Sequence, residues 1–534
     1  MRLTYSNMLA TTALLALAAC GGGGGGGGGA TNPGTVTPPA PVENVVLTLS
    51  PSPALVTQNA GTGTTFTVSI KASSAIPAGV NAAVAAKADL FSNTSLSTVS
   101  AQEYEARITT NATLAAGTYN STIEVKLCTD AASTCRTPLA GSPWLLPVTL
   151  TVKKVGNLSA LAPVAGLHAW NQAQYDAART SYIPATFTPS AFSFRWTVDP
   201  DSAKLRRFKP VVVADKKVYL VSSMPAGNGA EPDWTLQAVE ELTGLDRWRT
   251  DMGKRAQTSL PVLGDNRLHL FSSGATGNTY RTYNLGTGQQ MSHLPSTVVQ
   301  TTDYAPPLVS GTTVYGQYGP AGALSKFDSA STTPLWQFTE STRGGWAVST
   351  DGTLIYNFTQ GIMLGIEAAT GKLAYASPSL LPYSGAPATM APVLNGTQVF
   401  VTESDSRGGA LAAFSAATGK LNWQVQASFT SYPALVGSTL YAVNGGKLEA
   451  RNSANGDPLW TSLALGAVQD EPYTEVLATD NLAFAASQSR VVAVDLATHK
   501  VVWEYPAGGS IAISENGILY ITHPVNGVVA INLR

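Results

Sequence analysis

The chain has 534 residues, which is long enough for two or more domains, and charged residues make up only 12% of it. Its formal net charge of −1 argues against a nucleic-acid partner, because such partners require a basic face. The abundance of small residues, including 50 glycines, indicates a soluble, β-rich protein and identifies no chemistry.

The first residues have the pattern of a secretion signal. One positive charge, Arg2, precedes an apolar run from Met8 to Ala19 that is too short to span a bilayer. The run ends in the residues LAAC, which resemble the lipobox of bacterial lipoproteins. In that family the signal peptide is removed before the cysteine, and the cysteine is acylated. The resemblance implies a signal peptide at 1–19 and a lipidated Cys20, so that lipid alone anchors the protein in the membrane.

A low-complexity segment follows at 20–42. It contains nine consecutive glycines, Gly21 to Gly29, and then a Pro/Thr-rich stretch. Such a composition cannot build a core and acts as a flexible tether, with a reach of about 25 Å. Gly21 stands where an Asp would resemble the signal for inner-membrane retention. The resemblance therefore implies the outer membrane, on its periplasmic face or at the cell surface.

A small β-domain is predicted at 43–154. Five short segments alternate between apolar and polar residues and are separated by turn residues: NVVLTLS, TFTVSIKA, YEARITT, STIEVKL and LLPVTLTVKK. This pattern predicts an antiparallel β-sandwich. Residues 115–152 resemble the closing half of bacterial immunoglobulin-like modules, which implies a spacer or an adhesive platform.

Two cysteines, Cys128 and Cys135, flank the segment TDAAST, which we predict to be a hairpin turn. An oxidising periplasm permits a disulfide between them, which would contribute roughly 2–3 kcal/mol. A redox or metal pair is the alternative, but no histidine or third thiol accompanies the two residues.

The remainder of the chain is repetitive, with a connector and lead-in at 155–191 and a propeller at 192–534. A tight turn of the type AATG recurs, followed by a strand with an aromatic residue, and the copies lie about 42 residues apart. That spacing is typical of a four-stranded propeller blade. The aromatic position is occupied by Trp248, Ser292, Trp336, Tyr375, Trp423, Trp460 and Trp503.

The sequence contains eight apolar hairpins but only seven of these following strands, because the last copy stops at the chain terminus. The segment FSFRWTV at 192–198 carries Trp196 and is predicted to supply the missing outer strand, which closes the ring and removes its open edge. We therefore predict an all-β protein with an eight-bladed propeller after the immunoglobulin-like sandwich. Gly371 and Gly419 should supply a positive φ in the turns, and the aromatic residues should pack between blades. The repeated motif is a structural joint rather than a cofactor site.

The repeat, together with the lead-in AWNQAQYDAARTSYIP at 169–184, resembles the pyrroloquinoline-quinone-type propeller superfamily. That superfamily contains quinoprotein alcohol dehydrogenases and also non-catalytic BamB-type lipoproteins, which scaffold the assembly of outer-membrane β-barrels. The dehydrogenases carry adjacent cysteines beside the quinone and a calcium held by Glu, Asn and Asp. No two cysteines are adjacent here, and the predicted propeller contains none. We therefore predict no cofactor and no enzyme activity.

The sequence contains no other catalytic or metal-binding motif. None of the five histidines lies at a metal-binding spacing; they are His168, His269, His293, His499 and His523. Carboxylates such as Glu403 and the pair Asp470-Glu471 are predicted to be solvated loop charges. A catalytic triad scattered across blades leaves no signature in sequence order. We predict no catalytic residue and no metal site.

The resemblance implies a non-catalytic outer-membrane lipoprotein, expected to be a monomer, that binds envelope proteins as BamB does. A surface-displayed adhesion or glycan-binding protein is the second hypothesis, and a quinoprotein dehydrogenase is the third. Binding residues should lie on the face that carries the long loops. We predict a basic cluster there that steers an acidic partner or serves only solubility, formed by Arg206, Arg207, Lys209, Arg249, Lys254 and Arg255.

Overall fold

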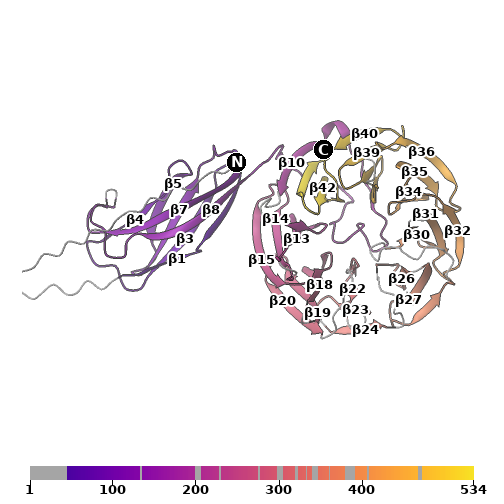
Figure 1. Ribbon diagram of the computed structural model, residues 1–534, viewed down its shortest axis with the longest axis horizontal. Helices are drawn as coiled ribbons and strands as arrows, with labels where there is room; N and C mark the ends of the chain where they lie inside the picture. Colours follow the sequence, from indigo (N-terminus) through magenta and orange to yellow (C-terminus); the bar gives the residue numbers. More distant parts are fainter. Residues whose placement is uncertain are drawn as a thin grey trace, which may run out of the picture.

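The computed structural model describes two β-domains (Figure 1). The described residues are 45–132, 135–198, 206–227, 230–274, 277–296, 305–318, 323–331, 333–339, 347–359, 361–378, 391–405, 408–466 and 472–534. A 3₁₀ turn lies at Pro189–Ala191. Within the described residues, no helix is long and apolar enough to cross a membrane. The predicted lipid attachment site Cys20 and the tether lie outside the described residues.

The N-terminal domain is a sandwich of two four-stranded sheets, with strand orders β1-β3-β6-β5 and β2-β8-β7-β4. The apolar residues of each strand alternate with polar ones, so one side of each sheet enters a shared core that includes Ile70, Ile108 and Leu146. All five predicted strands are present. The strands are β1 (Leu47–Ser50), β2 (Ala54–Asn59), β3 (Thr65–Ala72), β4 (Asn81–Ala85), β5 (Phe91–Thr98), β6 (Glu103–Thr110), β7 (Gly117–Cys128) and β8 (Trp144–Lys153).

A disulfide joins Cys128, the last residue of β7, to Cys135, with 5.3 Å between their Cα atoms. The segment after β7 folds back onto the end of that strand. Cys128 and Pro138 form an isolated antiparallel β-bridge, and the N–H of Leu139 donates to the carbonyl of Leu127 (2.8 Å). The cross-link therefore closes a short connection between β7 and β8.

The C-terminal domain is a ring of eight sheets, each with four main strands (Figure 1), so the predicted fold class is confirmed. The first four blades contain β11 (Arg207–Phe208), β12 (Val212–Ala214), β13 (Lys217–Met224), β14 (Asp233–Glu240) and β15 (Asp246–Lys254); β16 (Gln257–Thr258), β17 (Val262–Gly264), β18 (Arg267–Gly274), β19 (Gly277–Asn284) and β20 (Gln290–Ser296); β21 (Leu308–Ser310), β22 (Thr313–Gln317), β23 (Leu324–Asp328) and β24 (Pro334–Phe338); and β25 (Val348–Thr350), β26 (Leu354–Thr359), β27 (Ile362–Glu367) and β28 (Leu373–Ala376).

Blades 5 to 8 continue the ring in the same order. They contain β29 (Val393–Leu394), β30 (Gln398–Asp405), β31 (Gly408–Ser415) and β32 (Leu421–Gln426); β33 (Ala434–Val436), β34 (Thr439–Asn444), β35 (Lys447–Asn452) and β36 (Pro458–Ala464); β37 (Glu475–Thr479), β38 (Leu482–Ala486), β39 (Val491–Asp495) and β40 (Val501–Tyr505); and β41 (Ser510–Ile513), β42 (Ile518–His523) and β43 (Gly527–Asn532).

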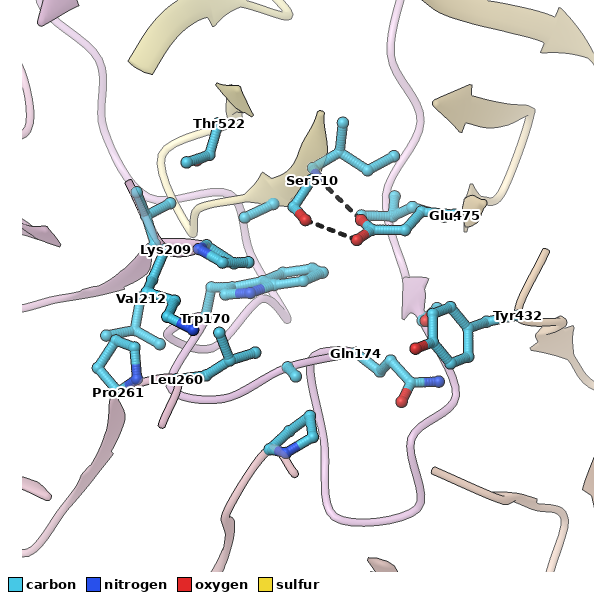
Figure 2. A pocket seen from close by; sticks show the side chains of 18 of the residues that line it. Trp170, Gln174, Lys209, Val212, Leu260, Pro261, Tyr432, Glu475, Ser510 and Thr522 are labelled. Carbon is cyan, nitrogen blue, oxygen red and sulfur yellow. Dashed lines mark hydrogen bonds between the residues drawn. The ribbon is translucent and has the colours of Figure 1, made fainter. Parts of the chain in front are cut away.

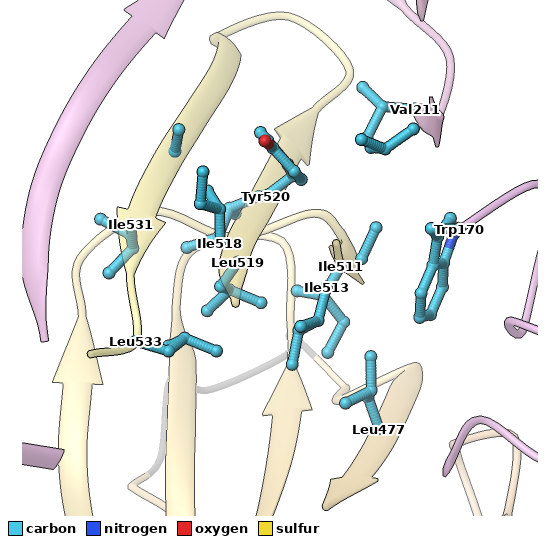
Figure 3. Close-up of a cluster of buried hydrophobic side chains, with 14 of the residues drawn as sticks. Trp170, Val211, Leu477, Ile511, Ile513, Ile518, Leu519, Tyr520, Ile531 and Leu533 are labelled. Atoms are coloured by element: carbon cyan, nitrogen blue, oxygen red, sulfur yellow. The ribbon is translucent and has the colours of Figure 1, made fainter. Parts of the chain in front are cut away.

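The ring is closed by a strand from the start of the propeller. Strand β10 (Ser193–Val198) pairs antiparallel with β43 and becomes the outer strand of blade 8, with Trp196 opposite Ala530. This confirms the predicted closure by residues 192–198. The last blade is anchored by a large apolar cluster that includes Tyr520, Ile531 and Leu533 (Figure 3). Closure by a distant segment ties the two ends of the ring together and leaves blade 8 without an unpaired edge at β43.

The repeated aromatic residues lie between neighbouring blades. The ring of each outer strand contacts the turn glycine of the next blade: a Cβ added to Gly244 would lie 2.7 Å from the Trp196 ring, and one added to Gly371 would lie 2.6 Å from the Trp336 ring. The polar atom of the ring donates to a carbonyl of the same turn, as from Trp196 Nε1 to Glu241 (2.8 Å). The same bond recurs from Trp248 to Leu285, Trp336 to Ala368, Tyr375 to Ala416 and Trp423 to Ser453.

Three positions vary this joint. His499 replaces the turn glycine in blade 7, adopts a φ of 59° and stacks on Trp460 with 4.1 Å between ring centroids. Trp503 contacts Phe192 edge to face at the seam where the chain closes. Ser292, the predicted departure from the aromatic position, instead shares a hydrogen bond with Thr282 on the adjacent strand (2.5 Å). The glycine turns have the predicted positive φ, at 74° for Gly371 and 67° for Gly419.

The sandwich is attached to blade 1 at the turn that precedes β15. Lys153, at the end of β8, contacts the carbonyl of Gly244 and forms an ion pair with Asp246 (3.1 Å). Asn59 Nδ2 donates to the carbonyl of Thr243 (3.0 Å). Burial raises the pKa of Asp246, but the charges of Lys153 and Arg249 outweigh burial and leave it below its ordinary value. The contact therefore uses a shielded ion pair rather than an exposed one.

Candidate functional site

The connectivity of the blades gives the propeller two different faces. The connections from one blade to the next, and those between the second and third strands, emerge on one face, which we call the loop face. The hairpin turns and the repeated glycine turns emerge on the opposite face, which we call the turn face. The innermost strands begin at the loop face and run towards the turn face. Residues 199–205, 340–346 and 406–407 lie outside the described residues.

The lead-in segment passes through the central channel and bonds to the innermost strands (Figure 1). In six blades the backbone N–H of an inner-strand residue donates to a lead-in carbonyl, and in blade 3 the amide of Gln172 bonds to both backbone groups of Val309. Inner edges that would otherwise be unpaired are thus satisfied by the chain itself. The six backbone pairs are Val213 with Trp170, Leu263 with Asn171, Thr350 with Ala177, Leu394 with Ala178, Leu435 with Thr180 and Ala478 with Ser181.

Arg179 fixes the lead-in at the middle of the channel. Its side chain is completely buried and donates to the carbonyls of Val348 (3.0 Å), Ala173 (2.6 Å) and Pro307 (2.8 Å). Burial lowers the pKa of Arg179 to about 10, so the guanidinium still carries its charge at neutral pH. The segment also holds four non-glycine residues at positive φ: Gln174, Tyr175, Arg179 and Ser181. Such strained backbone persists only where surrounding contacts determine it.

A pocket of about 300 Å³ lies in the channel on the loop-face side of the lead-in (Figure 2). The lead-in forms its floor with Trp170 and Gln174, and its walls are residues at the start of the inner strands or just before them. These wall residues precede, along each strand, those that bond to the lead-in. The wall includes Lys209, Val211, Leu260, Pro306, Tyr432, Glu475 and Ser510.

Glu475 is the acidic group of this pocket. Its carboxylate accepts hydrogen bonds from Ser510 Oγ (2.7 Å) and from the backbone N–H of Ile511 (3.0 Å). Burial raises the pKa of Glu475, and these two bonds offset only part of the increase. Lys209 lines the pocket from blade 1, with its Nζ atom 5.8 Å from the centre of the Trp234 ring. Figure 2 shows the indole of Trp170 between Lys209 and Glu475.

The pocket combines apolar walls with one acidic and one basic side chain, which suits binding of a small polar molecule or of a side chain from a partner. Among the residues that the structure describes, no three His, Cys, Asp or Glu side chains gather as metal ligands would. Glu475 and Arg179 could not be recognised from the sequence, because each occurs once and belongs to no motif. The sequence feature that could have indicated their region is the lead-in at 169–184, which is more polar than a linker requires.

The predicted basic cluster is divided in the structure. Lys209 enters the central pocket, Arg206 donates to Ser222 Oγ (3.3 Å), and Arg207 and Lys254 are exposed. Arg255 is half-buried at the seam between blades 1 and 2, where its carbonyl accepts from Trp234 Nε1 (2.9 Å).

Arg249 does not lie in a loop with these residues, contrary to the prediction. Strand β15 continues to Lys254, because β14 pairs with it along its whole length through two irregularities. Arg249 is therefore part of the strand and forms an ion pair with Asp246 (2.8 Å) near the turn face.

The predictions for the loop carboxylates and for His269 have different outcomes. Glu403 was predicted to be a solvated loop charge, but it is buried within β30, because β30 extends to Asp405 and pairs with β31 along its whole length. Asp470 and Glu471 lie outside the described residues. His269 is a packing residue: it is buried, with its ring nitrogens 2.8 Å from the Tyr280 hydroxyl and 3.1 Å from the carbonyl of Gly264.

Comparison with known proteins found similar solved structures and one matching family model. BamB from Moraxella catarrhalis is similar over 64% of this chain and 97% of its own, with 14% identity and a TM-score of 0.48. A europium-containing methanol dehydrogenase is similar over 67% of this chain and 90% of its own, with 12% identity and a TM-score of 0.48. A search of curated proteins found no match. The family model described as outer membrane protein assembly factor BamB matches residues 320–534, which supports a propeller of the pyrroloquinoline-quinone type.

Proposed function

We propose that this protein is a non-catalytic lipoprotein of the outer membrane whose propeller binds and scaffolds protein partners in the cell envelope. The match of residues 320–534 to the family of the outer membrane protein assembly factor BamB supports this role. The lipobox-like residues before Cys20 support the anchor.

The observation that carries the proposal is the asymmetry of the channel. The lead-in occupies the inner strand edges towards the turn face, and the sandwich is attached to a turn of blade 1. The loop face retains a pocket that exposes groups of both charges, Lys209 and Glu475, on a rigid support. Binding residues concentrate where loops and pockets are held by such a scaffold. A partner is therefore expected to dock on the loop face and to insert a polar side chain into the pocket.

Binding of an envelope glycan is a second candidate. It is favoured by the aromatic side chains of Trp170 and Tyr432, which line the pocket beside the polar groups of Gln174 and Glu475. Aromatic faces and polar groups together suit a sugar ring with its hydroxyls. The two candidates differ in what should be recovered with the protein from cells.

Crosslinking in cells tests the docking face. The loop-face variant combines Lys209→Glu with Glu475→Lys, and the matched control combines Lys372→Glu with Lys420→Glu, two exposed lysines in turns of the turn face. We expect the loop-face variant to recover about tenfold less of the partner, because its charge pattern is inverted, and the control to recover wild-type amounts. Mass spectrometry of the recovered material separates a protein from a glycan. Equal recovery by both variants, with thermal unfolding unchanged, would contradict docking on the loop face.

The anchor is tested by Cys20→Ser. We expect this variant to remain unprocessed or to appear in the soluble fraction, because no acyl chain can be added without the thiol. Membrane fractionation and the mass of the mature chain provide the measurement. Normal processing and outer-membrane recovery of the variant would show that Cys20 is not the attachment site.

A further inference from the structure

The seam between blades 1 and 2 contains three basic side chains at different depths. Arg281, on β19, is only 6% exposed. His293 is its cross-strand partner on β20 and is exposed, and Arg255 follows β15 of blade 1 and is half-buried. Tyr283 lies two residues from Arg281 on the same side of β19 and belongs to the core cluster shared by blades 1 and 2. Arg281 therefore points into this seam.

Within the described part of the seam, no ion pair with a carboxylate balances the two arginines. Burial lowers the pKa of Arg281; the neighbouring Tyr283 opposes this effect, and the charge of Arg255 adds to it. Burial also lowers the pKa of His293, with further contributions from Arg281 and Arg255. Among the described residues, neither Arg255 nor Arg281 forms an ion pair with a carboxylate. The three groups consequently repel one another.

Other buried arginines of this protein have acceptors for their guanidinium groups. Arg451 pairs with Glu449 (2.8 Å), and Arg179 donates to three carbonyls. Arg195 has carbonyl and amide acceptors, including Asn532 Oδ1 at 2.8 Å. Arg255 does contact the carbonyl of Lys254, and Arg281 has a side-chain hydrogen bond with Tyr283, but the Nε atoms of both arginines are buried without an acceptor. Two guanidinium groups in one seam, each with an unfilled buried donor, are costly in a folded protein unless an anion binds them.

We propose that the seam between blades 1 and 2 binds a phosphate group, either as free phosphate or as part of a phosphate ester, through Arg281, Arg255 and His293. A guanidinium group can donate two parallel hydrogen bonds to two oxygens of a phosphate. The two negative charges of a phosphate dianion also neutralise two arginines, which a single carboxylate cannot do. The depth of the three groups defines the direction of entry. The phosphate enters past the exposed His293, contacts Arg255 and reaches Arg281, and any ester substituent remains towards solvent.

This inference is independent of the proposed scaffold function, because the seam is separate from the central pocket. Calorimetric titration of the detergent-solubilised full chain with inorganic phosphate tests it. We expect saturable binding by the wild type and about tenfold or greater weakening in Arg281→Gln and in Arg255→Gln, since each removes one charged donor. Arg207→Gln is the matched control, because Arg207 is exposed on blade 1 outside the seam, and it should bind within about twofold of wild type.

Two further titrations refine the assignment. Sulfate keeps its charge between pH 5.5 and 7.5, so its affinity should rise at the lower pH as His293 becomes charged, and His293→Gln should abolish this rise. Tighter binding of glycerol 3-phosphate than of phosphate would identify an ester such as a lipid headgroup as the source, and equal binding would identify free phosphate. Absence of saturable binding, or equal affinity in Arg255→Gln and wild type with folding intact, would overturn the proposal. The half-buried Arg255 keeps the test decisive if Arg281→Gln fails to fold.

Discussion

The two ends of the central channel are constructed from different kinds of contact. Towards the turn face, backbone groups of the inner strands bond to backbone groups of the lead-in, and Arg179 bonds only to carbonyls. Towards the loop face, the channel is lined by side chains whose chemistry differs from blade to blade, among them Lys209 and Glu475. Backbone bonding fixes geometry with little dependence on side-chain identity. One end thus provides a rigid support, and the other end can be specialised for recognition.

This comparison predicts that substitutions towards the turn face affect stability, whereas substitutions in the pocket affect binding. The largest effect is expected for Arg179→Met, which leaves three buried carbonyls without their donor. We expect the free energy of unfolding to fall by about 3–5 kcal/mol. Urea denaturation measures the loss, and exposed Arg207→Met is the control, expected within about 0.5 kcal/mol of wild type. A loss below about 1 kcal/mol for Arg179→Met would mean that the lead-in is not the support.

Acid should weaken the structure near the turn face of blade 2. Burial lowers the pKa of His269 to about 4, from 6.5 in the unfolded chain. Because the folded pKa is the lower one, the stability contribution is present above pH 6.5 and is lost as the pH falls towards 4. The loss amounts to about 3 kcal/mol.

His269→Gln isolates this contribution from the titration of carboxylates. The difference in unfolding free energy between pH 7 and pH 4 should be about 3 kcal/mol smaller in the variant than in wild type. His168→Gln, at an exposed histidine, should retain the wild-type dependence. Parallel pH profiles for His269→Gln and wild type would exclude His269 as the source.

The repeated part of this architecture could be predicted from the sequence, whereas the features that occur only once could not. Each glycine turn, hairpin and aromatic strand occurs many times, so chance matches are averaged out and the period indicates a blade. The closing strand at 192–198 followed from the unequal number of hairpins and outer strands. Arg179, Glu475 and the path of the lead-in occur once, and their roles depend on which distant strands they meet.

The prediction for the loop face failed at Arg249 for a related reason. Arg249 was expected on the face that carries the long loops, whereas β15 extends through Lys254 because two irregularities allow β14 to pair with it further. A repeat gives the mean length of a strand, but a β-bulge in one blade changes which residues reach the loop. The period of the repeat therefore does not determine which residues at a strand end reach the loop face.

Substitutions at the interblade joints should lower the free energy of unfolding by an intermediate amount. A Cβ added to Gly419 would lie 2.4 Å from the Tyr375 ring, and the φ of Gly419 is 67°. Gly437 has a φ of 56° but an open surrounding with no atom within 4 Å. We expect Gly437→Ala to cost about 1 kcal/mol through its backbone alone and Gly419→Ala about 2–3 kcal/mol, because a clash is added. Thermal or urea unfolding compares the two, and equal losses would show that the joint adjusts without strain.

The smallest effect on stability is expected for Glu475→Gln, at the loop-face end of the channel. The amide can accept from the N–H of Ile511 and donate to Ser510 Oγ, so both neighbours remain bonded. Because burial raises the folded pKa of Glu475, the charged carboxylate opposes folding at high pH, and this cost disappears as the pH falls. The variant should therefore be equal to or up to about 1 kcal/mol more stable than wild type at pH 7.5, with no advantage in acid, a trend of opposite sign to that of His269. Partner recovery from crosslinked cells should nevertheless decrease, since the pocket has lost its negative charge. A loss of more than about 2 kcal/mol at pH 7.5 would instead make Glu475 part of the support, and the two ends of the channel would no longer differ in kind.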